Sequence, residues 1–232
     1  MIPAEVIQKL EYRLNKSNSN AYANVDELAM VEAINKAQLE WVRRQLKGSN
    51  STRDQGEESL TRVDDLQVLL KTEPLSVRSS DLYCQTDALP SNYGWFNGVL
   101  VYAKKGECTG QLMQDVHHIE ESNANNWLSD ENKKPDFEFR QCFYTLANNR
   151  LKVYTNNEFK IEKVLLTYYR KPVHFDIEGL IYPDESLGTN IPLEFKDDVI
   201  ELIIDEAVTI IAADIEHASA LTTANQRKEN NN

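Results

Sequence analysis

The chain of 232 residues is 41% apolar and 27% charged, which is typical of a folded protein with a buried core. Its 37 acidic and 25 basic side chains give a net charge of −12, which argues against a broad phosphate-binding surface. No apolar run approaches the ~18–20 residues of a membrane span, and the first residues begin no signal peptide, so we expect no membrane association.

Helical periodicity dominates the first third of the chain. Apolar residues at four-residue spacing predict a helix over 3–15. A capping-box pattern and a long apolar stripe predict a second helix over 24–47. The composition of 48–58 is that of a flexible loop, and a third helix is predicted over 59–71, ended by Pro74.

Aromatic and β-branched clusters between turn residues follow from about residue 75. Asn148 and Asn149 form a hairpin turn signal between two of these clusters, because asparagine tolerates positive φ. Strands joined by short turns, with no helix between them, predict an antiparallel sheet. The predicted strands lie at 82–86, 98–103, 110–120, 136–146, 150–155 and 160–169.

The last predicted helix covers 194–218, and its apolar positions span more than a narrow stripe, as in a helix packed on two sides. The predicted fold class is α+β. A small helical bundle, with a long N-terminal helix packed on a long C-terminal helix, carries an inserted antiparallel β region and an extended C-terminal arm. The predicted segments are the N-terminal helical segment of residues 1–74, the β region 75–175, the loop and C-terminal helix 176–218 that complete the helical core, and the polar arm 219–232.

Histidines and carboxylates around residue 118 raise the question of a metal site. His118 and Glu120 would share one face of a strand, but a zinc site needs three or four ligands at recognised spacings, and no HExxH or paired CxxC is present. We therefore predict a solvated polar strand edge and no metal. The residues weighed for this site are His117, His118, Glu120, Glu121 and Cys108. An odd number of widely spaced cysteines, Cys84, Cys108 and Cys142, indicates reduced thiols.

Catalytic motifs are missing from the sequence. The carboxylates of the last helix have the spacing of a solvated helix face, and this face could equally meet a neighbouring subunit. An acid–base pair would instead need two carboxylates in contrasting, partly buried environments. No GxSxG, P-loop or GxGxxG pattern occurs. The sequence thus predicts no enzyme, no catalytic residues and no cofactor. The carboxylates considered are Asp198, Glu201, Asp205 and Glu206.

Aromatic residues at the end of the last strand are candidates for an interface, since tyrosine and arginine bury a large area and keep a polar tip. An ordinary strand end, with one tyrosine inside and one outside, explains them equally well. The aromatic pair within SNYGWFNG is likewise either a loop anchor or a hydrophobic turn. The candidate interface residues are Tyr93, Trp95, Phe96, Tyr168, Tyr169 and Arg170, with Gln226, Arg227 and Lys228 of the arm.

The order of three stretches resembles a known family. AINKAQLEWVRRQL on the second helix, LTYYRKP at the end of the last strand and DDVIELIIDEAVTIIAADIE on the final helix resemble the ring-forming adaptors of the tailed-bacteriophage head–tail connector. The most specific resemblance is to the ring proteins of crAss-like short-tailed phages. It covers roughly a third of the chain, and the β region is larger than in the minimal adaptors of that family.

This resemblance implies a non-enzymatic virion protein that is assembled in the host bacterial cytoplasm. It implies a homo-oligomeric ring of about twelve copies that links the portal to neighbouring ring or tail proteins. Genomic DNA would only pass through the channel, and an acidic wall would not hold it. The arm 219–232 would lie on a neighbouring subunit or on the portal. The alternative is an intracellular protein-binding module or regulatory subunit that grips one partner with its β region.

Overall fold

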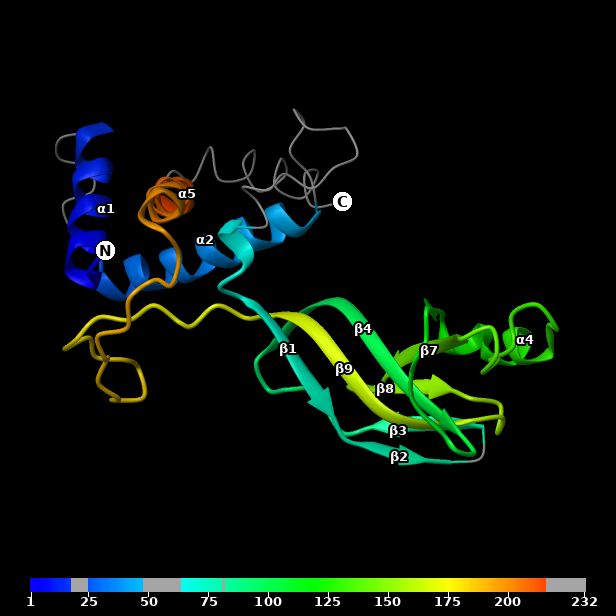
Figure 1. Cartoon of the computed structure of the whole chain (residues 1–232). Coiled ribbons are helices and arrows are strands. Elements are labelled where there is room, and N and C mark those ends of the chain that lie inside the picture. The colour runs from blue at the N-terminus through cyan, green and yellow to red at the C-terminus, as the bar shows by residue number, and fades with distance from the viewer. Residues whose placement is uncertain (18–24, 48–63, 81, 216–232) are drawn as a thin grey trace. The chain divides into compact units, whose positions relative to one another are not determined.

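The computed structural model describes residues 1–17, 25–47, 64–80 and 82–215 (Figure 1). The chain divides into two compact units, a helical unit of residues 1–68 and 172–232 and a β unit of residues 69–171. The predicted loop 48–58, the start of the third predicted helix and the predicted arm lie outside the described residues. The finer segment boundaries predicted from the sequence stay predictions. Within the described ranges, no helix is both long and apolar enough to cross a membrane.

Three predicted helix positions are confirmed in the helical unit. They are α1 (Pro3–Ser17), α2 (Glu27–Lys47) and α5 (Asp197–Ile215). Fully buried side chains such as Ile34 on α2 and Ile203 on α5 lie in the core of this unit, where α5 contacts both other helices. In Figure 1, α5 is seen nearly end-on while α2 runs across the view, so α5 crosses α2 steeply.

The predicted fold class, a small helical bundle with an inserted antiparallel β region, is wrong. Two curled β-sheets dominate the structure, with 34% of the residues in strands and 33% in helices, and the described residues contain no long N- and C-terminal helical bundle. Helical periodicity in a sequence shows which side of a helix is buried, but it does not show whether the helices run side by side. The helices here cross instead of aligning.

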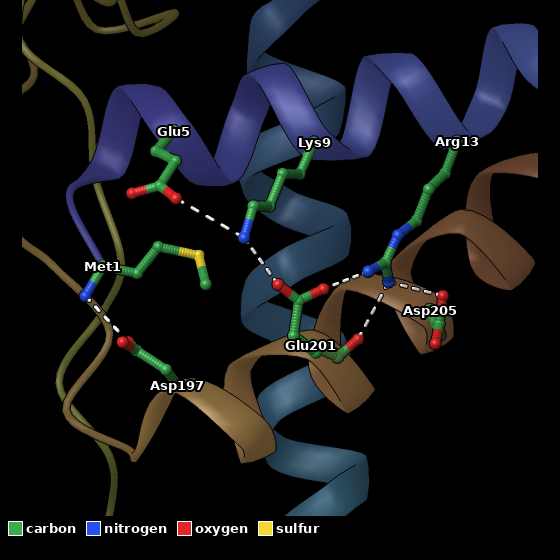
Figure 2. Close-up of polar contacts among 7 residues, drawn as sticks. All are labelled: Met1, Glu5, Lys9, Arg13, Asp197, Glu201 and Asp205. Carbon is green, nitrogen blue, oxygen red and sulfur yellow. Dashed lines mark hydrogen bonds and ion pairs between the residues drawn. The ribbon is translucent and has the colours of Figure 1, made fainter.

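Polar contacts join α1 to the outer side of α5 (Figure 2). Lys9 Nζ donates to Glu201 Oε1 at 2.6 Å, and the Arg13 guanidinium contacts both Glu201 and Asp205. Glu5 and Lys9 form a further ion pair within α1 at 3.4 Å. The hydrogen bond from Lys9, together with the charge of Arg13, holds the pKa of Glu201 below its usual range.

Replacing Glu201 with glutamine is expected to lower the free energy of unfolding by up to about 1 kcal/mol at neutral pH, because partly exposed ion pairs contribute modestly. The lowered pKa means that the contribution is present at neutral pH and is lost as the pH falls through the acid range. Denaturant unfolding between pH 7 and pH 4 measures both effects. Glu11→Gln on the exposed side of α1 is the control and should leave the pH dependence unchanged.

An irregular segment, residues 172–196, runs between the last strand and α5. The Asn35 side chain on α2 fixes its beginning. Its Oδ1 accepts from Phe175 N at 2.8 Å, and its Nδ2 donates to Phe175 O at 2.9 Å. Since both Asn35 and Phe175 are buried, this amide satisfies two backbone groups that have no sheet partner.

The described residues of the β unit form nine strands, which are arranged in two sheets (Figure 1). Sheet A has the order β1-β9-β4-β5 and is antiparallel throughout. Sheet B has the order β2-β3-β8-β7-β6. The strands of sheet A are β1 (Leu70–Leu75), β4 (Tyr93–Lys105), β5 (Cys108–Leu112) and β9 (Lys160–Arg170). Those of sheet B are β2 (Val77–Ser79), β3 (Tyr83–Thr86), β6 (Asp115–His118), β7 (Gln141–Ala147) and β8 (Arg150–Tyr154).

The two sheets pack against each other through one apolar core. Val101, Val164 and Leu166 of sheet A meet Leu151 and Val153 of sheet B, and all five are fully buried. Period-2 alternation explains the arrangement, because successive side chains of a strand point to opposite faces. Each sheet therefore has one face in the core and one face turned away from it.

The other face of sheet B is covered by the connection between β6 and β7, which contains η1 (Glu121–Asn123) and α4 (Ala124–Ser129). Trp127 of α4 packs edge-on against Phe143 with the ring centroids 5.6 Å apart. Glu121 accepts hydrogen bonds from Thr145 and Lys152, which lowers its pKa. This connection gives sheet B a second apolar cluster of its own.

Three sequence predictions for this region are wrong. The end of the helix predicted over 59–71 is β1, which pairs with β9 and accommodates Pro74 because it is an edge strand. The predicted sheet without helices contains η1 and α4. Strands β6 and β7 are parallel, so sheet B is mixed and not antiparallel. A parallel neighbour needs a crossover connection, and η1 and α4 supply it.

The predicted hairpin between β7 and β8 is confirmed. Ala147 pairs with Arg150, and the two turn residues, Asn148 and Asn149, have φ of 53° and 57°. These values are those of a two-residue turn that matches strand twist.

Asn149→Ala is expected to destabilise the β unit by about 1 kcal/mol, because a left-handed conformation is costly for a residue with no local side-chain hydrogen bond. Asn149→Gly should be as stable as the natural chain or more so. Thermal unfolding of the two variants measures the difference, and equal melting temperatures would contradict the assigned turn.

Candidate functional site

The candidate functional site is the face of sheet A that points away from the core. In the antiparallel register, Trp95 lies opposite Tyr169, Leu100 opposite Leu165 and Tyr102 opposite Leu112. Residues directly opposite each other share a face, so these side chains lie on one surface across β5, β4 and β9. On the same face, Gly98 and the hydrogen-bonded pair Thr72 and Thr167 separate Trp95 and Tyr169 from Leu100 and Leu165. We define the outer sheet face as Leu70, Trp95, Leu100, Tyr102, Leu112, Leu165 and Tyr169.

Solvent reaches this face although it is largely apolar. Leu100 is 45% exposed, and Leu70 and Leu112 are each 36% exposed. None of the residues of the outer sheet face belongs to the apolar cluster between the sheets. Single exposed apolar side chains are common, but a contiguous set on a rigid sheet is typical of a contact surface.

The contrast with sheet B gives this observation its weight. Sheet B turns aromatic side chains such as Phe143 and Tyr154 away from the core, and the η1–α4 connection covers them. In the portion of the β unit that the structure describes, no helix covers the outer sheet face in the same way. Apolar residues on both faces of a sheet are typical of a sheet with two covered faces.

Four of the predicted interface residues lie on the inner face of the same strand pair. Tyr168 is fully buried, and its hydroxyl, a single donor, lies 2.9 Å from Asn92 Oδ1 and 3.2 Å from Glu73 Oε1. Tyr93 packs on Tyr168, and Phe96 packs on Tyr144 of sheet B. Arg170 pairs with Tyr93 at the end of this ladder. Tyr168 is therefore a core residue, and its burial leaves it no surface to offer a partner.

Trp95 and Tyr169 are the predicted residues that lie on the outer sheet face. Gly94 precedes Trp95 where the β4–β9 register shifts, and a Cβ at Gly94 would lie 2.8 Å from Tyr169 O. The close backbone approach therefore requires glycine at this point. It lets β4 begin at Tyr93 instead of at the predicted position 98. The predicted residues Gln226, Arg227 and Lys228 lie outside the described residues.

Sequence reasoning missed most of the outer sheet face, although the sequence contained a signal. In GVLVYA and KIEKVLLTYY, apolar residues occupy both alternating positions of a strand, not one. This pattern predicts a strand that is in apolar contact on both sides. Leu100, Tyr102 and Leu165 are the second set in these two strands.

The residues weighed for metal binding and catalysis lie elsewhere. His117 Nε2 contacts Asp115 at 2.8 Å, and its ring packs on Trp127. Among the described residues, no group of three or more histidine, cysteine or acidic side chains has the arrangement of a metal site. The carboxylates of α5 are engaged by bases, Glu201 by Lys9 and Arg13, and Glu206 by Arg44 at 2.9 Å.

No protein-family model matches the chain, and no curated protein matches it.

Proposed function

We propose that this protein is a structural adaptor without catalytic activity, which assembles into a homo-oligomeric ring in the head–tail connector of a tailed phage. The observation that carries the proposal is the outer sheet face, a largely apolar and partly exposed surface on a rigid sheet. A protein whose task is assembly needs such a surface. Burial of apolar area there would drive association.

The assignment to a head–tail connector, and thus to the virion, rests on the resemblance of the three sequence stretches described above. The charge distribution supports it. Residues 69–171 contain 13 basic and 13 acidic side chains, whereas the rest of the chain contains 12 basic and 24 acidic ones. The whole excess of negative charge therefore belongs to the helical unit. An acidic unit facing the channel would let DNA pass without phosphate contacts.

Mass measurement of the full chain tests the proposal. Native mass spectrometry and sedimentation are expected to show a ring of about twelve copies at high protein concentration, as the resemblance implies. The preparation should not bind duplex DNA at physiological salt. A chain that stays at one or two copies would contradict the ring and would favour the alternative, a binding module that grips one partner through the same face.

A further inference from the structure

A loop of the helical unit displays two large aliphatic side chains to solvent. Ile181 and Leu187 are 68% and 69% exposed, and they face each other across an isolated antiparallel bridge. Residues paired in this way have their side chains on the same side. The two therefore form one apolar protrusion, which we call the loop tip (residues 181–187).

The backbone of the loop tip is held in one conformation. Tyr182 N donates to Ser186 O at 3.0 Å, and Glu185 N donates to Tyr182 O at 2.9 Å. Gly188 N closes the loop with a 2.7 Å hydrogen bond to Leu180 O. Leu180 and Gly188 are buried, so the two ends of the loop are anchored while its tip is exposed.

Asp176 ties the loop tip to the rest of the helical unit. Its carboxylate accepts from Ile177 N at 2.8 Å, from Tyr182 Oη at 2.9 Å and from Thr189 N at 2.6 Å. Burial alone would raise the pKa of Asp176, but these hydrogen bonds outweigh it and hold the pKa below its usual range. A side chain that is only 7% exposed thus serves to keep an exposed loop in place.

Gly188 is closely surrounded by backbone and side-chain atoms. A Cβ at this position would lie 2.4 Å from Ile177 O and 2.8 Å from the Asp176 carboxylate. The loop is therefore preorganised, and a partner would not have to order it on binding. Solvent-exposed apolar side chains on such a rigid loop are typical of residues that contact a binding partner.

The charges beside the two apolar surfaces are complementary. Asp184 and Glu185 are exposed on the loop tip, and the Asp184 carboxylate accepts hydrogen bonds from Ser186 N and Oγ. Lys163 is exposed and lies opposite Tyr102 on the outer sheet face. The loop tip is thus apolar with an acidic border, and the outer sheet face is apolar with a basic one.

We propose that the loop tip of one copy docks on the outer sheet face of a second copy of this chain. Ile181 and Leu187 would cover Leu100 and Leu165, with Asp184 or Glu185 near Lys163. The inference rests on the proposed function, and it names the partner of the outer sheet face. Because the two surfaces differ, each copy offers one and receives the other, and this head-to-tail contact is the kind that closes a ring.

Cross-linking between two singly substituted chains tests the contact. In a Cys108→Ser background, which removes the exposed native thiol, one chain carries Leu187→Cys and the other carries Leu100→Cys. The two remaining cysteines, Cys84 and Cys142, are buried. A mixture of the two chains with a short bis-maleimide is expected to give a cross-linked dimer, whereas neither chain alone should give one.

Phe139→Cys is the matched control for Leu100→Cys, because Phe139 is 78% exposed in the β unit and does not belong to the outer sheet face. Mixed with the Leu187→Cys chain, it should give no cross-linked dimer. A dimer from the Leu187→Cys chain alone would show a contact between two loop tips and would overturn the proposal.

Mass measurement of the same samples tests the proposed docking contact separately from the proposed ring. Multimers without a cross-link in the Leu187→Cys and Leu100→Cys mixture would overturn the docking proposal and leave the ring standing. A chain that remains monomeric at every concentration would overturn both.

Discussion

For the proposed ring, Leu100→Glu is expected to give monomers that unfold at the same temperature as the natural chain does when it is diluted to monomers. Leu100 points away from the core and is 45% exposed in the single chain, so a glutamate there meets water and not the core. At an interface the same carboxylate would be buried without a partner. Central apolar contacts typically contribute about 2 kcal/mol or more, a loss of roughly 30-fold in affinity per contact.

Sedimentation velocity and thermal unfolding measure the two halves of this expectation. Phe139→Glu is the control, since it places the same charge on an exposed apolar site outside the outer sheet face. If the Leu100→Glu chain assembled at the same concentrations as the natural chain, the outer sheet face would take no part in assembly. A large drop in melting temperature, measured where both chains are monomeric, would instead mean that Leu100 is covered within the single chain.

Asn35→Ala is expected to destabilise the helical unit by about 3 kcal/mol. The side chain satisfies both the N–H and the C=O of Phe175, which is fully buried in a segment without secondary structure. Each buried backbone group left without a partner costs about 1–3 kcal/mol. The methyl group of alanine replaces neither hydrogen bond.

Denaturant unfolding of the full chain measures the change. Lys36→Ala, at the next position on the exposed side of α2, is the control and should change the free energy of unfolding by less than about 0.5 kcal/mol. If Asn35→Ala were equally mild, the segment after β9 would have to be held by contacts other than this amide.

Local patterns predicted the elements whose conformation is decided locally. The apolar stripe of α2 and the acidic start of α5 place both helices within a few residues, and two asparagines place the β7–β8 turn. In contrast, β1 reads as helix because Leu66 and Leu70 have helical spacing. It becomes a strand by pairing with β9, about 95 residues later in the sequence. A pairing between residues so far apart cannot be predicted from a short stretch of sequence.

The candidate site was predictable in position but not in orientation. Aromatic residues at the end of β9 were identified from the sequence, yet Tyr168 is core while its neighbour Tyr169 is on the outer sheet face. Because side chains alternate along a strand, Tyr168 and Tyr169 must lie on opposite faces of sheet A, but the alternation does not show which of them faces the core. That depends on where sheet B packs, and the uncovered state of sheet A depends on where the η1–α4 connection lies.

The division of the helical unit between the two ends of the chain governs how the nascent protein folds. The β unit is continuous in sequence, so it is complete when residue 171 has left the ribosome. Helix α2 ends at Lys47, whereas its partner α5 begins at Asp197, about 150 residues later. At typical rates of translation, α5 is synthesised on the order of 10–30 s after α2, and the apolar side of α2 lacks this partner until then. During that interval the nascent chain is exposed to chaperones and to premature association. The helical unit is therefore complete only once translation has passed α5.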